Sequence, residues 1–166
     1  MFTFYKKHNN KLYNKLVDLS RNKYFYKDIG LEDKIETRIL LIFFHLSLIF
    51  YVIKKDTEKL RKQEIFDNVF QNIEYHLREL GHGDVSVNQK MKKLTKVFYD
   101  ILVYYDKNKV SISHFDILKK YFFDNKKNSH DKVEKLANYF AKFHNFCFDL
   151  EVKNMLNGSL DFVYKD

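Results

Sequence analysis

Residues 77–90 read Leu-Arg-Glu-Leu-Gly-His-Gly-Asp-Val-Ser-Val-Asn-Gln-Lys and join two long amphipathic patterns. Gly81 follows the last apolar position of the first pattern, where a glycine adopts positive φ at no steric cost and ends a helix. Ser86, with Gln89 three residues later, predicts the N-cap of a second helix. Apolar residues recur at the three- and four-residue steps of a helix face on both sides of this connection: Phe66, Val69, Phe70, Ile73, Leu77 and Leu80 before it, and Val87, Met91, Leu94, Phe98, Ile101 and Tyr105 after it.

The composition indicates that the whole chain, like this hairpin, is helical. The 166 residues include only four glycines and no proline, too few for the many turns of an all-β fold. Apolar residues make up 45% and charged residues 31%, which is typical of a globular domain with a core. We therefore expect one all-α domain over residues 1–166, a bundle of about six or seven helices, with a loose N-terminus at 1–8 and a C-terminal tail at 159–166. The main helices are expected at 10–23, 32–55, 57–80, 87–106 and 129–150.

The most apolar run, Ile39 to Ile53, lies in the second of these helices. It is 15 residues long and contains His45 and Ser47, whereas a membrane-spanning helix needs roughly 20 apolar residues. A helix that is apolar all round is otherwise the central helix of a bundle. We favour this core interpretation, and a membrane-contacting segment is the alternative.

The last long helix, 129–150, carries two adjacent apolar stripes. So wide an apolar surface is either buried on two sides or exposed as a groove. The stripes are Val133, Ala137, Phe140, His144 and Cys147, and Leu136, Tyr139, Phe143, Phe146 and Leu150.

The formal net charge is +8, so the protein is expected to associate with acidic surfaces such as nucleic acid, ribosome or anionic lipid. Lysine, asparagine and isoleucine are abundant and alanine is scarce, a bias typical of AT-rich genomes, so part of the lysine excess reflects composition. Lys92, Lys93 and Lys96 cluster away from an apolar stripe. They form a solvated face on the simpler interpretation and a contact to phosphate or acidic protein on the functional one.

The sequence shows no catalytic motif. It has no phosphate-binding glycine loop, no His-Glu-x-x-His and no Cys-x-x-Cys, so we expect no enzyme, metal or cofactor. The single cysteine, Cys147, excludes an intramolecular disulfide and indicates a reducing compartment, and no secretory signal is visible. A metal site using His76, His82 and Asp84 is the least favoured hypothesis.

The residues themselves resemble a known family. The run Leu77 to Leu94, followed by Phe98-Tyr99, closely resembles the signature of the ubiquinol–cytochrome c chaperone family. The match continues at both ends and covers most of the chain, although the second half of the 87–106 helix and the connection 125–130 depart from the pattern. It includes Arg21, Phe25-Tyr26-Lys27-Asp28, Gly30, Asp33, Arg38 and His45 upstream, and Met155-Leu-Asn-Gly158-Ser-Leu-Asp-Phe162 downstream.

The resemblance implies a non-enzymatic chaperone for assembly of respiratory complex III, whose client is newly made cytochrome b, a hydrophobic membrane protein. Members work with a small partner protein near the ribosome exit tunnel, so ribosome contact and peripheral membrane association are also expected. The implied location is the cytoplasm of a bacterium, at the inner membrane, or the matrix side of a mitochondrion. An apolar helical groove would suit such a client.

The candidate client- or partner-binding residues follow from this resemblance and from the lysine face. They are Arg78, Glu79, Gly81, Asp84, Lys92, Lys93, Tyr99 and His45. For Arg78, Glu79 and Asp84 two interpretations stay open: they pair to lock the turn, which we place first, or they edge a partner site. The alternative function for the whole chain is a basic ribosome- or RNA-binding helical module.

Overall fold

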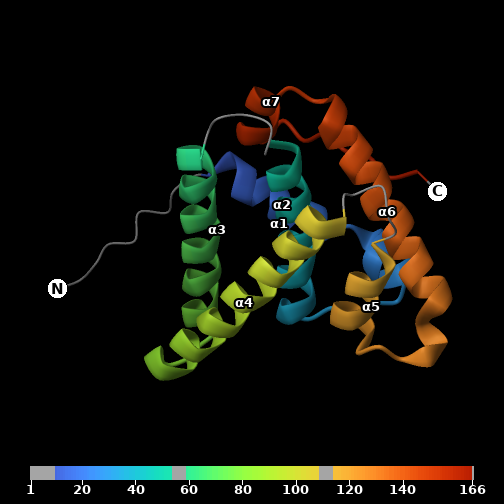
Figure 1. Ribbon diagram of the computed structural model, residues 1–166. Helices are drawn as coiled ribbons and strands as arrows, with labels where there is room; N and C mark the ends of the chain where they lie inside the picture. The colour runs from blue at the N-terminus through green and yellow to red at the C-terminus, as the bar shows by residue number, and fades with distance from the viewer. Residues whose placement is uncertain (1–9, 54–58, 109–113, 166) are drawn as a thin grey trace.

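The computed structural model describes residues 10–53, 59–108 and 114–165, which form α-helices and no strand (Figure 1). The all-α bundle with seven helices is thereby confirmed. Two short turns of π- and 3₁₀-type, Tyr24–Asp28 and Lys127–Ser129, complete the regular structure. The helices are α1 (Lys11–Ser20), α2 (Ile35–Ile53), α3 (Lys59–Glu79), α4 (Asp84–Asn108), α5 (Phe115–Phe123), α6 (His130–Asp149) and α7 (Val152–Leu156).

Several predicted boundaries fall outside the described residues. They are the loose N-terminus at 1–8, the end of the second helix at Lys55, the start of the third at Thr57, and the last residue of the tail, Asp166.

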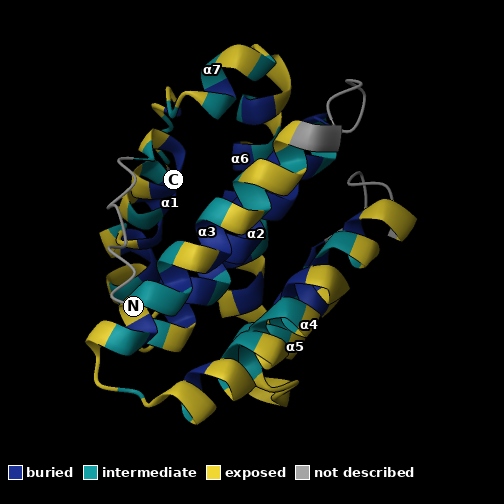
Figure 2. Cartoon of the chain, turned by 90° about the vertical axis from the view of Figure 1, so that its left-hand side faces the viewer, coloured by how far each residue is buried: buried dark blue, intermediate teal, exposed yellow. Residues whose placement is uncertain are grey.

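Helix α2 is the centre of the bundle. It packs against α1, α4 and α6, and its run from Leu41 to Phe50 is buried without interruption. Figure 2 shows it almost wholly buried behind the more exposed α3 and α4. Within the described chain it is the one helix long and apolar enough to cross a membrane, yet 67% of its most apolar window is buried inside the protein. The prediction of a central core helix is confirmed.

A buried polar contact fixes α2 against α6. His45 is completely buried, with Nδ1 2.6 Å from the Leu41 carbonyl oxygen and Nε2 2.8 Å from the Tyr139 hydroxyl. Because a carbonyl oxygen only accepts, Nδ1 carries the proton and Tyr139 donates to Nε2. Both ring nitrogens are therefore satisfied by a neutral imidazole.

The α3–α4 connection has the predicted glycine stop. Gly81 has φ of +88°, its N–H donates to the Arg78 carbonyl at 3.0 Å, and the His82 N–H donates to the Leu77 carbonyl at 3.3 Å. This pair of bonds is a Schellman motif, which satisfies carbonyls left open at a helix end.

The predicted N-cap at Ser86 is wrong. Helix α4 begins at Asp84, three residues before the predicted start at Val87, and its first turn is closed by the Val87 N–H donating to the Gly83 carbonyl at 2.9 Å. Ser86 therefore lies inside the first turn and does not precede it.

The wide apolar surface of α6 is buried on two sides. Helices α2 and α5 cover it, and the C-terminal tail packs along it through Phe162, whose ring lies 5.5 Å from Tyr139 and 5.3 Å from Phe143, centroid to centroid. Among its large apolar side chains only Phe148, outside both stripes, is markedly exposed. The two stripes therefore form no open groove.

Candidate functional site

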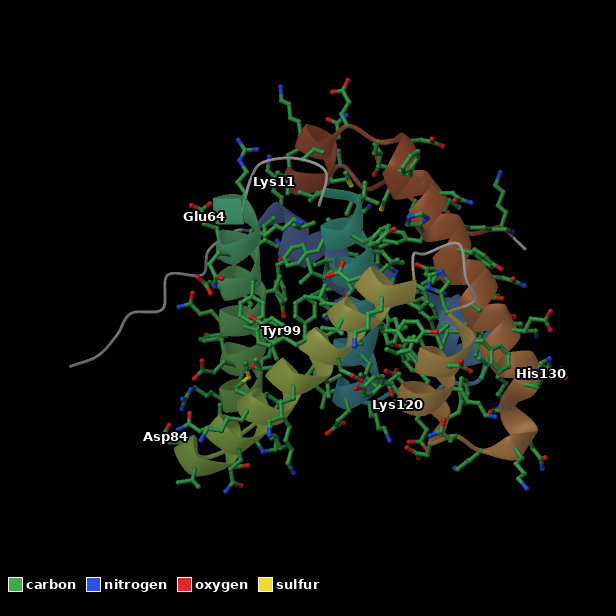
Figure 3. All side chains as sticks on the ribbon, viewed as in Figure 1. Lys11, Glu64, Asp84, Tyr99, Lys120 and His130 are labelled. Atoms are coloured by element: carbon green, nitrogen blue, oxygen red, sulfur yellow. The ribbon has the colours of Figure 1, made fainter. Side chains whose placement is uncertain are left out.

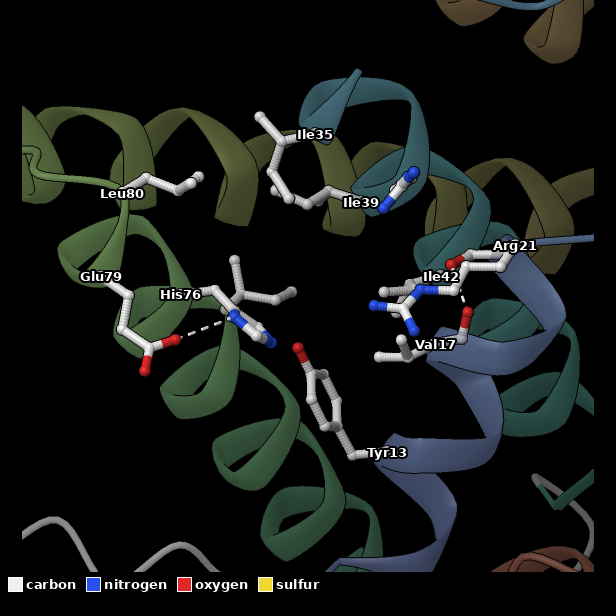
Figure 4. A pocket seen from close by; sticks show the side chains of 12 residues that line it. Tyr13, Val17, Arg21, Ile35, Ile39, Ile42, His76, Glu79 and Leu80 are labelled. Carbon is white, nitrogen blue, oxygen red and sulfur yellow. Dashed lines mark hydrogen bonds and ion pairs between the residues drawn. The ribbon is translucent and has the colours of Figure 1, made fainter. Parts of the chain in front are cut away.

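An apolar pocket of about 170 Å³ opens between α1, α2 and α3, beside the α3–α4 connection (Figure 4). Its walls come from α1 and its C-cap, the first two turns of α2, and the end of α3 with the residue that follows it. Apolar residues dominate the lining, while Arg21, Arg38, His76 and Glu79 stand with them around the opening. The apolar lining residues are Val17, Ile35, Ile39, Ile42, Ile73 and Leu80.

Helix geometry explains why these residues converge. Val17 is on α1, and Arg21, the C-cap of that helix, follows four residues later. Ile35, Ile39 and Ile42 follow three- and four-residue steps on α2. Ile73 and His76 do the same on α3, and Leu80 directly follows that helix. Leu80 directly follows α3 and is 60% exposed, so the pocket continues onto the surface as an apolar edge. Such concave, mostly apolar sites with a few polar groups are typical binding sites.

Most charges at the opening are already paired. Arg38 contacts Asp33 at 2.7 Å. Glu79 lies 3.4 Å from Nδ1 of His76. For the guanidinium of Arg21 there is no ion pair or hydrogen bond with any other residue that the structure describes.

Tyr13 supplies a polar group inside the pocket. Its side chain is 6% exposed, and Figure 4 shows the hydroxyl directed into the space between α1 and α3. The ring lies 6.4 Å from that of His76, centroid to centroid. Burial raises the pKa of Tyr13 to about 12, with Arg21 acting in the opposite direction, so the phenol stays protonated at neutral pH.

Four of the predicted site residues lie together at the hairpin. Arg78 donates to Glu74 at 2.9 Å and to Asp84 across the turn, while Gly81 forms the turn itself. Glu79 points the other way, toward His76, and lines the pocket. The structure thus gives Arg78 and Asp84 the turn-locking contact, and it places Glu79 at the pocket opening.

The other predicted site residues lie elsewhere. Lys92, Lys93 and Tyr99 are on the exposed side of α4, and Figure 3 shows Tyr99 well along α4 from Asp84 at the tip. Tyr99 is 50% exposed and its ring lies 5.8 Å from that of Phe66. His45 is in the core, so its side chain reaches no surface.

The histidines of the turn have separate neighbours. His76 contacts Glu79, whereas Nε2 of His82 lies 3.4 Å from Nζ of Lys90. No group of three or more metal-ligating side chains is present in residues 10–53, 59–108 and 114–165.

A second pocket, of about 450 Å³, lies between the start of α2, the end of α5 and the start of α6. Its lining has three lysines and three carboxylates. Lys34 and Glu32 form an ion pair, with 2.7 Å between Nζ and Oε2. The formal charges of its lining therefore sum to zero.

The sequence did not reveal the first pocket as a site. Tyr13, Val17 and Ile35 look like ordinary core positions, and they come from helices separated by the 21–34 segment. Arg21, Arg38 and Glu79 were noticed because they resemble the family pattern, and the fold brings all three to one opening. Their shared membership of the family pattern was the one sequence signal that pointed to this site.

Comparison with known proteins agrees with the fold. The sequence profile described as ubiquinol-cytochrome C chaperone matches residues 27–162. The crystal structure of the Cbp3 homolog from Brucella abortus superposes with a TM-score of 0.72 at 25% sequence identity, over 94% of this chain and 87% of that one. No curated protein sequence gives a significant match.

Proposed function

Because the chain belongs to the ubiquinol-cytochrome C chaperone family, we propose that it is a non-enzymatic assembly chaperone for cytochrome b of ubiquinol–cytochrome c reductase. The observation that carries this proposal is the apolar pocket between α1, α2 and α3. Three residues of the family resemblance, Arg21, Arg38 and Glu79, stand at its opening.

The pocket suits a segment of a hydrophobic client. Its apolar lining and the exposed Leu80 form a surface that can take the apolar face of a helix, a common mode of peptide recognition. The volume of about 170 Å³ is small for a cofactor and comparable to one large side chain. A single anchoring side chain in such a pocket often contributes most of a binding energy.

The proposal includes the setting in which the client is met. The protein acts in the cytoplasm of a bacterium, at the inner face of the membrane, where cytochrome b is inserted. Its net charge of +8 favours contact with anionic lipid and ribosomal RNA. A small partner protein remains part of the proposal, with the hairpin tip around Asp84 as its contact.

Site-specific photo-cross-linking tests the client and the pocket together. A photoreactive phenylalanine analogue at Leu80 is expected to cross-link to cytochrome b in native membranes. The matched control is the same analogue at Phe148, which is 59% exposed against 60% for Leu80 but lies on α6. Absence of a cytochrome b adduct from Leu80, together with unchanged cytochrome b levels in cells lacking the protein, would refute the proposal.

The exposed lysines of α4 favour one alternative function, a ribosome- or RNA-binding module. Lys92, Lys93 and Lys96 are all exposed. Binding that depends on them should weaken steeply as salt increases, because phosphate contacts release counterions. Binding to purified ribosomes that is insensitive to both salt and a Lys92→Gln/Lys93→Gln change would exclude this alternative.

A further inference from the structure

Two polar groups at the apolar pocket lack partners within the described part of the chain. The hydroxyl of Tyr13 has no hydrogen bond although the side chain is only 6% exposed. Arg21, the exposed C-cap of α1, lies at the same pocket, and its guanidinium has no carboxylate partner among the described residues. The Tyr13 hydroxyl is directed into the pocket and Arg21 is exposed at its opening, so both groups are available to a ligand.

Both groups are donors. The phenol of Tyr13 stays protonated because burial raises its pKa to about 12, and a guanidinium has donors only. The site therefore lacks an acceptor, and a carboxylate is the side chain that accepts from a phenol and a cation together. Such charge-assisted bonds are roughly twice as strong as neutral ones.

The remaining charges around the opening set the position of this acceptor. Arg38 is neutralised by Asp33, 2.7 Å away. Glu79 and His76 occupy the α3 side, so a carboxylate there would meet a like charge. The α1 side is the one place at the opening where negative charge is favoured.

Resting on the proposed function, we propose that the pocket recognises an amphipathic client helix that carries an acidic residue beside its apolar anchor. The anchor is a large apolar side chain between Ile39, Ile42 and Ile73. The Asp or Glu carboxylate of the same helix accepts from Arg21 and from the Tyr13 hydroxyl. Apolar contact then supplies affinity, and the carboxylate selects the segment and its orientation.

Binding of two synthetic peptides tests this inference. The peptides are amphipathic helices with one tryptophan on the leucine face and, at its edge, either Glu or Gln. Because the chain contains no tryptophan, the fluorescence reports the peptide alone. The Glu peptide is expected to bind about tenfold more tightly than the Gln peptide, which corresponds to about 1.4 kcal/mol.

Two conservative variants assign the preference to the named groups. Arg21→Gln should remove most of the discrimination between the peptides, and Tyr13→Phe should reduce it while keeping the apolar ring. Lys23→Gln is the matched control, since it removes an exposed cation close in sequence that does not line the pocket, and the full preference should remain. Unfolding midpoints confirm that each variant is folded.

The outcomes separate this inference from the function on which it rests. Equal binding of the two peptides, no binding of either, or an unchanged preference in Arg21→Gln would overturn the carboxylate inference. If Leu80 still cross-links to cytochrome b, the chaperone function stands without it. A tenfold preference that Arg21→Gln abolishes, but Lys23→Gln retains, would support the inference.

Discussion

Arg78, the penultimate residue of α3, donates to Asp84, the first residue of α4, and one guanidinium thereby ties the two helices across the glycine turn. Its other terminal nitrogen donates to Glu74 at 2.9 Å, one turn earlier on α3. The aspartate also lies in the first turn of α4, where negative charge is favoured by the helix dipole.

Charge reversal at Arg78 tests whether this contact locks the turn. Arg78→Glu is expected to lower the urea midpoint of unfolding, because it replaces two attractive contacts by repulsion from Glu74 and Asp84. The double change Arg78→Asp/Asp84→Arg should recover part of the loss, since it restores opposite charges across the turn. Normal stability of Arg78→Glu combined with lost partner binding would instead place Arg78 at the edge of a partner site.

The glycine stop offers a comparison between two neighbouring positions. Gly81→Ala is expected to destabilise the protein by about 1–2 kcal/mol, because Gly81 has φ of +88° and a left-handed conformation is costly for residues with a Cβ. Gly83→Ala is the control, since Gly83 has no positive φ and a Cβ there meets no atom within 4 Å. Chemical denaturation should separate the two variants, and equal losses would contradict the conformational explanation.

Local chemistry predicted the hairpin, and tertiary contacts decided the rest. Gly81 ends α3 as expected because its backbone conformation is a local property. Ser86 was wrongly predicted as the N-cap. The first hydrogen bond of α4 is accepted by the Gly83 backbone carbonyl, so the helix begins before Ser86. A sequence pattern of this kind predicts the existence of a helix better than its first residue.

Neither the pocket nor the burial of α6 by the C-terminal tail could be predicted from local sequence patterns. The apolar stripes of α6 indicated wide burial but could not show that Phe162 of the tail would cover Phe143 and Tyr139. Likewise the period of α1 marks Val17 as apolar, but the opening beside it depends on how α1, α2 and α3 pack together. Such gaps between packed helices depend on crossing angles, which sequence periodicity does not determine.

Cys147 is expected to be unreactive in the native protein. The thiol is completely buried on α6, and burial raises its pKa to about 12, so almost no thiolate exists at neutral pH. A thiol-specific reagent should therefore label the native chain very slowly and label one thiol per chain in denaturant. Rapid labelling without denaturant would show that α6 opens locally.

The hydroxyl of Tyr139 is expected to stabilise the core through His45. Tyr139→Phe keeps the ring but removes the donor 2.8 Å from Nε2 of His45, leaving a buried acceptor unsatisfied. The expected loss is about 1–3 kcal/mol in the free energy of unfolding. Tyr104→Phe is a suitable control because that tyrosine is only partly buried. A Tyr139→Phe variant as stable as the parent would mean that water replaces the hydroxyl.

Stability should fall as the pH falls through the histidine range. Burial lowers the pKa of both His45 and His114 to about 4, below the value near 6.5 of an unfolded histidine. The unfolded chain therefore binds more protons between these values, so the free energy of unfolding rises with pH up to about 6.5 and is then independent of these groups. Each histidine contributes up to about 1.4 kcal/mol per pH unit within that window.

The variant His114→Gln isolates one of the two contributions. His114 is buried, and its Nδ1 lies 3.0 Å from the Tyr105 hydroxyl. His144 is close enough to interact with it electrostatically, so protonation of His114 would place a charge near a second imidazole. Urea unfolding between about pH 7 and pH 5 should show a shallower loss of stability in this variant than in the parent, because fewer buried groups must titrate. Above about pH 7 the two stability curves should run parallel, since both imidazoles are then neutral in the folded and unfolded chains. Equal slopes below about pH 6.5 would show that His114 stays accessible to protons in the folded protein.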